Sequence, residues 1–211
     1  MRLLGGKVRI VIGTLLVCAA VFLVLYNIRE SNRAGEESSR ILSALEEALE
    51  GREKEAEGRS YPIRDPLIPE EVVPEMPVEV IDGYRYIGVL EIPGLDLSLP
   101  VMEEWDETRL KISPCRYTGS YYTDDLVICG HNYASHFSAI KWIDIGERVL
   151  FKAVDGVVYE YIVTNREVLQ PRQVEDMIES EADWDLTMFT CTTGGQTRCA
   201  VRCEYIKEPD E

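Results

Sequence analysis

The sequence predicts a mainly β fold, an antiparallel or mixed barrel of about 130 residues, preceded by an N-terminal transmembrane helix. Two observations predict this arrangement. The first is an uninterrupted apolar segment, residues 8–26, close to the N-terminus. The second is a series of short apolar segments separated by turn residues, which begins near residue 84 and continues almost to the C-terminus. No internal repeat is visible.

The apolar segment 8–26 has the length and composition of a membrane span. Its only charged residue is Arg9, and a helix rising about 1.5 Å per residue spans about 28 Å over this length, close to the hydrocarbon thickness of a bilayer. Basic residues precede the segment, and acidic residues dominate after it. We therefore expect a single-pass cell-membrane protein, with a cytoplasmic tail at 1–7 and the remaining chain outside. The alternative is a cleaved signal peptide, although no clear small-residue cleavage site follows Tyr26.

The charge of the chain argues against a nucleic-acid partner. The formal net charge is −16, and no acidic residue lies among the first 29 residues, so the remaining chain carries −20 (18 basic and 38 acidic residues). A body of this charge repels nucleic acid and anionic lipid head groups. No basic stripe with interleaved aromatic residues is present, which excludes the usual single-strand binding surfaces.

Residues 27–82 are predicted to form an extracellular stalk followed by a proline-rich spacer. The polar segment 30–59 has the spacing of a helix, and its narrow apolar stripe favours a solvated stalk over a short self-associating coil. The stripe consists of Ile41, Leu42, Leu45 and Leu49. Segment 60–79 contains five prolines, which favour extended backbone. We expect this spacer to hold the folded body away from the membrane.

The remaining chain has the pattern of short strands. Asp155-Gly156 lies between two apolar segments and is a strong hairpin signal, and a Gly194-Gly195 loop separates the last two strands. Segment 126–129 is wholly apolar, as expected of a strand buried on both faces. Short helices are predicted at 136–142 and 174–178. Strands are predicted at 86–92, 95–101, 126–129, 148–153, 157–163, 186–190 and 198–206.

Three residues at the ends of predicted strands are candidates for catalysis. His131 follows a buried strand and is held with little freedom, which suits a proton donor or acceptor, although a structural histidine fits equally. Cys191 ends another apolar strand, where a thiolate is accessible, although single cysteines often act as small buried hydrophobes. Arg198 opens the last strand and is suited to stabilise an oxyanion, unless it forms a surface ion pair. Arg202, on the same strand face, competes for that role.

The cysteine count is consistent with a free thiol outside the membrane. Of six cysteines, Cys18 lies in the apolar segment, which leaves an odd number beyond it. Cys199 and Cys203 lie about 13 Å apart along one strand, at about 3.3 Å per residue, and cannot pair with each other without bending it. We expect both, together with Cys115 and Cys129, to be buried thiols.

Taken together, these motifs resemble the sortases, the cell-wall transpeptidases of mainly Gram-positive bacteria. The resemblance covers roughly Tyr86 to Ile206. Its motifs are Ile-Gly-Val-Leu-Glu-Ile-Pro at 87–93, Cys-Gly-His-Asn-Tyr at 129–133 with His136-Phe137, and Leu-Thr-Met-Phe-Thr-Cys at 186–191 followed by Arg198. It implies a closed barrel of about eight strands with short connecting helices, as a catalytic domain at 83–208.

The resemblance also assigns the site. It implies that His131, Cys191 and Arg198 are catalytic, and we expect their neighbours Asn132 and Thr190 to bind substrate. It implies no cofactor and no resident metal. Some family members bind calcium, but no loop here has a defensible calcium-binding spacing.

Three departures bear on the class of sortase. Met188 stands where the common Thr-Leu-x-Thr-Cys motif has leucine, which conserves volume. Gly-His-Asn at 130–132 resembles class B, without the insertions of that class. Asp65-Pro66 resembles the lid of pilin-polymerising sortases, but Leu67 stands where an aromatic residue is usual. The class therefore stays open.

The implied reaction begins with a secreted protein that carries a C-terminal LPxTG-like sorting signal. The Cys191 thiolate attacks the threonine carbonyl, and an amine from a cell-wall precursor or a pilin resolves the thioester. A hydrolase with the same chemistry, and a non-catalytic membrane-anchored scaffold, are the alternatives. A third alternative is a zinc site formed by Cys129, His131, His136 and Cys191.

Overall fold

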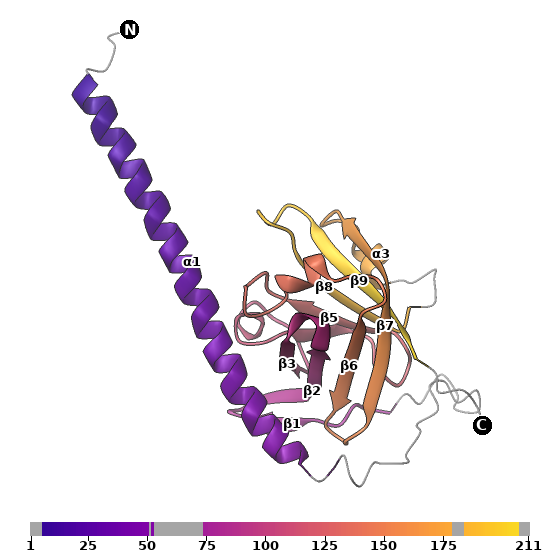
Figure 1. Ribbon diagram of the computed structural model, residues 1–211. Coiled ribbons are helices and arrows are strands. Elements are labelled where there is room, and N and C mark those ends of the chain that lie inside the picture. Colours follow the sequence, from indigo (N-terminus) through magenta and orange to yellow (C-terminus); the bar gives the residue numbers. More distant parts are fainter. Residues whose placement is uncertain (1–5, 51, 53–73, 179–183, 207–211) are drawn as a thin grey trace.

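The computed structural model describes residues 6–50, 52, 74–178 and 184–206. A single helix, α1 (Gly6–Leu49), runs through the apolar segment and through most of the predicted stalk without a break (Figure 1). Residues 27–49 contain no proline, and most of them are good helix formers (Glu, Arg, Ala and Leu), so the two predicted helices are continuous. Within the described residues, α1 is the one helix long and apolar enough to cross a membrane, and its apolar part is fully exposed.

The body is a closed β-barrel, as the sequence predicts. Nine strands form one sheet in the order β1-β2-β3-β4-β5-β8-β9-β7-β6, and β2 also pairs with β6. That pairing closes eight strands, β2 to β9, while β1 pairs with the first part of β2. The strands are β1 (Glu79–Ile81), β2 (Tyr84–Ile92), β3 (Leu97–Met102), β4 (Cys115–Thr118), β5 (Leu126–Gly130), β6 (Arg148–Ala153), β7 (Val158–Leu169), β8 (Leu186–Cys191) and β9 (Arg198–Tyr205).

The barrel interior is filled by alternate residues of its strands. Leu126 and Ile128 of β5, and Leu186 and Met188 of β8, belong to the inner cluster together with aromatic side chains of β6 and β7. Because side chains alternate across a strand, the residues between them face outward. Burial of this interior supplies the main stabilisation, at about 25 cal/mol per Å² of apolar surface.

The short connecting helices lie between the strands. They are the 3-10 helices η1 (Pro93–Leu95), η2 (Arg109–Lys111) and η3 (Ala139–Trp142) and the α-helix α3 (Val174–Ile178). The prediction for 174–178 is confirmed, whereas in segment 136–142 only the last four residues are helical. Two strands, β1 and β4, carry no sequence prediction, and β7 extends to Leu169. A register shift in the β7–β9 pairing, between Val163 and Asn165, lets β7 continue along β9.

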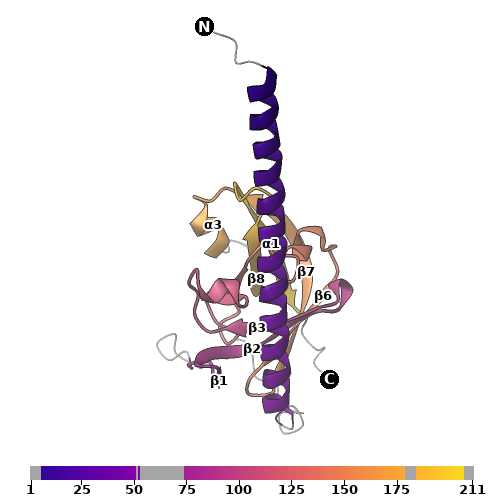
Figure 2. The same ribbon diagram turned by 90° about the vertical axis from the view of Figure 1, so that its left-hand side faces the viewer.

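The expectation of a solvated stalk is wrong for the described part of α1. Ile41, Leu45 and Leu49 are buried, as are Ser38, one turn before Ile41, and Ala34, two turns before it. These side chains form one face of the helix, and they pack against the outer surface of β1, β2 and β3. Viewed from the side, α1 lies directly over the barrel (Figure 2). Most of the predicted spacer at 60–79, namely residues 60–73, lies outside the described residues.

Candidate active site

Strand pairing brings the three candidate catalytic residues to one end of the barrel. β5 and β8 are parallel neighbours, and Gly130 pairs with Thr190. The next residue on each strand is His131 and Cys191, so these two leave their strands side by side. β9 is antiparallel to β8, and Arg198 is the direct partner of Cys191. The three therefore lie on adjacent strands at a common edge.

The same three residues also share a face. Leu186 and Met188 point into the barrel, so Phe189 and Cys191 point outward by alternation. On β5, Val127 and Cys129 belong to the outer cluster, and His131 continues that register. The arrangement thus places an imidazole, a thiol and a guanidinium on the outer surface of neighbouring strands.

Cys191 differs from the other extramembrane cysteines in its accessibility. Its side chain is half-buried, whereas Cys115, Cys129, Cys199 and Cys203 are buried. Burial raises the pKa of each of these four thiols, and the pKa of Cys129 rises to about 12. They therefore stay protonated and shielded at neutral pH, as the sequence predicts. Cys191 is the accessible thiol among the described residues outside the apolar segment.

His131 is half-buried, and its ring stacks on Tyr133 with 4.6 Å between the ring centres. Burial lowers the pKa of His131, and the positive charge of Lys111 lowers it further, while Glu107 opposes them. The imidazole is therefore biased towards its neutral form. Tyr133 belongs to the 129–133 motif, but no pattern in the sequence points to Lys111 or Glu107, because they reach His131 only through the fold.

The two competing arginines have different environments. Arg202 is 1% exposed, and its guanidinium donates to Glu167 at 2.9 Å and to the Thr187 hydroxyl at 2.9 Å. It also donates to two carbonyl oxygens of α3 and lies 4.6 Å from the centre of the Trp184 ring. Arg202 is thus committed to holding α3 and the β7–β8 connection against the barrel.

Arg198 is half-exposed, and part of its guanidinium remains available to a ligand. Its Nη1 donates to the carbonyl oxygens of Gly195 and Thr197, both at 3.1 Å. These bonds fix the guanidinium within the β8–β9 loop beside Cys191. Because an arginine carries five N–H donors, others remain available to an oxyanion.

The two predicted substrate-binding residues lie beside the catalytic candidates but in different surroundings. Asn132 is half-buried and accepts a hydrogen bond from the Lys141 ammonium. Thr190 is 1% exposed and points into the barrel, so contact with a substrate is limited to its backbone. Substrate binding by either residue stays a prediction.

The four residues of the alternative zinc site are not gathered into one. The Cys129 thiol donates to the Cys115 carbonyl oxygen at 3.4 Å, and His136 is buried next to α1. Burial lowers the pKa of His136 to about 4. Among the described residues, no group of three or more His, Cys, Asp or Glu side chains is placed to share a metal ion.

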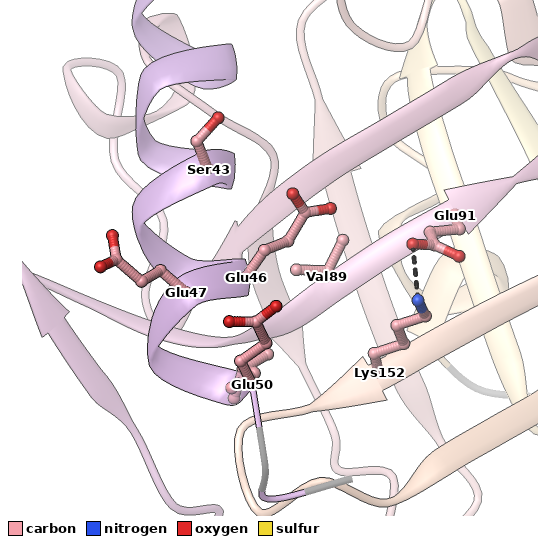
Figure 3. A pocket seen from close by; sticks show the side chains of 8 residues that line it. Ser43, Glu46, Glu47, Glu50, Val89, Glu91 and Lys152 are labelled. Carbon is pink, nitrogen blue, oxygen red and sulfur yellow. Dashed lines mark ion pairs between the residues drawn. The ribbon is translucent and has the colours of Figure 1, made fainter.

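A separate pocket of about 470 Å³ lies between α1 and the strands β2 and β6 (Figure 3). It is lined by Ser43, Glu46, Glu47, Leu49, Glu50, Val89, Glu91 and Lys152. Lys152 and Glu91 form an ion pair at 3.0 Å on the strand side of the pocket (Figure 3). The pocket contains none of the catalytic candidates, because it lies beside the C-terminal end of α1.

Comparisons with known proteins agree with this fold. The Sortase domain model matches residues 90–206. A sortase C structure from Streptococcus pneumoniae is 21% identical, with a TM-score of 0.56, over 80% of this chain and 97% of that one. A Clostridium perfringens sortase D5 structure is 18% identical, with a TM-score of 0.52, over 61% and 83%. A sortase C1 structure from Streptococcus suis is 25% identical, with a TM-score of 0.50, over 59% and 74%.

No curated protein sequence matches the chain. The domain match nevertheless covers more than half of it and includes the edge where β5, β8 and β9 bring His131, Cys191 and Arg198 together. The barrel closure, the site and the domain match lead to one conclusion: the chain belongs to the sortase family.

Proposed function

We propose that this protein is a membrane-anchored cysteine transpeptidase that cleaves an LPxTG-like sorting signal after threonine and joins the protein to an amine. One observation carries the proposal. Cys191 pairs directly with Arg198 on the neighbouring strand, and His131 follows Gly130, which pairs with Thr190, the residue before Cys191. Acyl transfer needs a nucleophile, a proton carrier and an oxyanion stabiliser, and these three side chains supply them.

In the first half of the reaction, the Cys191 thiolate attacks the threonine carbonyl carbon. The carbonyl oxygen becomes an oxyanion, which accepts hydrogen bonds from the Arg198 guanidinium. The carbon–nitrogen bond then breaks, and His131 donates a proton to the departing amine. The product is a thioester between Cys191 and the threonine, with a neutral imidazole on His131.

In the second half, an acceptor amine attacks the thioester carbon. His131 takes the proton from this amine, the carbon–sulfur bond breaks, and Cys191 leaves as a thiolate. The new amide joins the sorted protein to the acceptor, and both catalytic groups return to their starting protonation states. Water in place of the amine gives hydrolysis, which is the alternative with the same chemistry.

The acceptor amine belongs to a cell-wall precursor or to a pilin lysine in this proposal. The structure of the Streptococcus pneumoniae sortase C bears on pilin substrate specificity. Pilin specificity is a property of that protein, and the likeness to it supports the fold, so both acceptors enter the test. We place α1 in the cell membrane, with the N-terminus in the cytoplasm and the barrel outside, on the strength of the basic residues that precede the apolar segment.

The proposal is tested with the full chain in detergent micelles, because α1 buries apolar side chains against the barrel. A small library of LPxTG-like peptides is incubated with triglycine, diaminopimelate or a lysine peptide, and products are followed by mass spectrometry. We expect cleavage after threonine, an acyl adduct on Cys191 and an amine-ligated product. Cys191→Ala abolishes all three, and Cys199→Ala, which removes a buried thiol, is the matched control.

Two other results lead to different conclusions. Cleavage without ligation to any amine identifies a hydrolase. If no peptide is cleaved and an electrophile labels Cys191 no faster than the four buried cysteines, the site is not catalytic, and the scaffold alternative stands.

A further inference from the structure

The membrane-spanning part of α1 and the part that packs on the barrel belong to one helix. α1 is continuous from Gly6 to Leu49, without a proline between the two parts. Its buried face begins at Ala34 and continues through Leu45 and Leu49. The orientation of the barrel relative to the membrane therefore follows from the direction in which α1 crosses the barrel.

That direction places the catalytic end nearest to the membrane. At the N-terminal end of the packed segment, Ser135 donates to the Ser31 carbonyl oxygen at 2.8 Å, and a Cβ on Gly35 would lie 2.8 Å from the Cβ of Ser135. Ser135 lies in the loop that starts with His131. At the other end, Arg52 donates to the Val154 carbonyl oxygen at 3.0 Å, in the turn between β6 and β7.

The spacing along the helix sets the height of the catalytic end. Ser31 follows the last residue of the apolar segment, Tyr26, by five positions, which corresponds to about 8 Å of helix at about 1.5 Å per residue. The head-group layer on each side of a bilayer is roughly 5–8 Å thick. The loop after β5 thus lies at the level of the head groups, and in both views the free half of α1 extends past the barrel end near α3 (Figures 1 and 2).

The chemistry of this end suits lipid head groups. Trp142 is 78% exposed and Val168 is 63% exposed, although both belong to folded elements. Tryptophan is enriched where protein meets the membrane–water interface. Lys141 contacts Asn132, and Arg166 donates to the carbonyl oxygens of Lys141 and Ile143, so two cations accompany these apolar side chains in an otherwise acidic body.

We propose that the catalytic end of the barrel rests on the outer surface of the membrane that α1 crosses. Trp142 and Val168 contact the lipid head-group layer, and the exposed side of Cys191 lies next to that layer. The inference rests on the membrane anchoring in the proposed function, but not on the transpeptidase reaction. The sequence predicts a spacer that holds the barrel away from the membrane, whereas in this inference α1 holds the barrel against the membrane.

The test uses the full chain with Cys18→Ser, so that a fluorophore reacts with Cys191 and not with the cysteine in the apolar segment. The labelled protein is reconstituted in phosphatidylcholine vesicles that contain a lipid with a nitroxide on its head group. In the comparison protein, Cys18→Ser/Cys191→Ser/Val158→Cys, the label lies beside the β6–β7 turn. Ser31 and Leu49 are about 27 Å apart along α1 at about 1.5 Å per residue, so the two labels differ strongly in height.

We expect the label on Cys191 to lose most of its fluorescence and the label on Val158→Cys to lose little. Leu45→Asp, which places a carboxylate in the helix–barrel contact, restores the fluorescence at Cys191 because the barrel separates from α1. Ala44→Asp adds the same charge on an exposed position of the same turn and leaves the quenching unchanged. Trp142→Glu reduces the quenching, and Trp142→Phe retains it.

Two results overturn the inference. If the protein floats with the vesicles but both labels are quenched equally or not at all, the catalytic end does not face the bilayer, while the transpeptidase proposal is unaffected. If the protein does not float with the vesicles, α1 is not a membrane anchor, and the docking fails together with the proposed location. Peptide cleavage in micelles, measured in parallel, tests the reaction separately.

Discussion

Two arginines four residues apart on β9 have different environments although they share a strand face. Arg202 is buried and makes hydrogen bonds to a carboxylate, a hydroxyl and two carbonyl oxygens. Arg198 is half-exposed and lies opposite Cys191. The difference comes from what covers each residue, because α3 and Trp184 close over Arg202 and nothing in the described chain closes over Arg198 in the same way. Stability and activity should therefore respond separately to the two side chains.

Replacement of each arginine with methionine tests this division. Arg202→Met leaves Glu167, Thr187 and two carbonyl groups without their donor, so we expect a loss of about 2–4 kcal/mol in the free energy of unfolding. Arg198→Met should change that free energy by less than about 1 kcal/mol, as is usual for an exposed site, while peptide cleavage is lost. Urea unfolding and single-turnover cleavage measure the two effects. Equal loss of stability in both variants would contradict the assignment.

The protonation of His131 depends on its burial and, beyond that, on two charged neighbours of opposite sign. Because the active form in the proposed reaction carries an imidazolium together with a thiolate, a low pKa of His131 keeps the active fraction small at neutral pH. Lys111→Gln removes a charge that lowers this pKa, so the maximum rate should rise and the pH profile should move to higher pH. Glu107→Gln removes a charge that raises the pKa and should do the opposite.

The measurement is the rate of peptide cleavage between about pH 5 and about pH 10, a range that covers the ordinary histidine and cysteine titrations. A bell-shaped profile is expected for the unmodified protein. A profile that stays flat between about pH 6 and about pH 9, or shifts of the same sign in the two variants, would count against the pairing of His131 with Cys191.

Among the secondary-structure elements, α1 combines two kinds of surface that usually belong to separate segments. Its first half has the apolar composition of a membrane span, and its second half is amphipathic and packs on β1, β2 and β3. Neither half can move independently as long as the helix stays straight. The contact between α1 and the barrel therefore couples the orientation of the apolar half of α1 to that of the barrel.

Shortening one buried side chain of α1 tests how strongly the helix is held against the barrel. Leu45 is fully buried in the outer cluster, and Leu45→Ala should destabilise the helix–barrel contact by about 2–4 kcal/mol through lost contacts and a residual cavity. Limited proteolysis of the full chain in micelles reports this as faster cleavage within α1 beyond the apolar segment. Ser43→Ala, on the exposed side of the same turn, serves as the control. An unchanged cleavage rate for Leu45→Ala would mean that α1 does not dock.

The protein as a whole should be sensitive to acid at the contact between helix and barrel. His136, in the loop after β5, is fully buried next to α1, and burial lowers its pKa from 6.5 to about 4, with a smaller contribution from His131. The unfolded chain binds a proton near pH 6.5, whereas the folded chain does so only near pH 4. The stability associated with the neutral imidazole is therefore complete above about pH 6.5 and decreases as the pH falls towards about 4.

The size of this effect is on the order of 3 kcal/mol, from about 1.4 kcal/mol for each unit of pKa. Acidic side chains titrate over the same range, so the comparison uses His136→Gln, which keeps a polar side chain but does not titrate. We expect the midpoint of thermal unfolding to fall less steeply with decreasing pH in His136→Gln than in the unmodified protein. Parallel curves would show that His136 is not buried in its neutral form.

Local patterns account for much of this fold. Apolar runs and turn residues are properties of neighbouring residues, so the sequence alone predicts the membrane span, the strand Arg148–Ala153, the helix Val174–Ile178 and the position of Cys191 and Arg198 at strand ends. β4 has no such signal: its four residues, Cys115–Thr118, form a strand because β5 offers hydrogen-bond partners to them. Pairing partners lie far apart in the chain, and no local pattern specifies them.

The roles of individual residues divide in the same way. The sequence alone determined that the chain carries an apolar span, a β-rich body and a Cys, a His and an Arg in an order that resembles the sortases. The tertiary structure decided that Arg198 and not Arg202 remains accessible, that Lys111 and Glu107 act on His131, and that the second half of α1 packs on the barrel. Each of these depends on burial and on charges brought together by folding, which residues distant in sequence acquire only when the barrel closes.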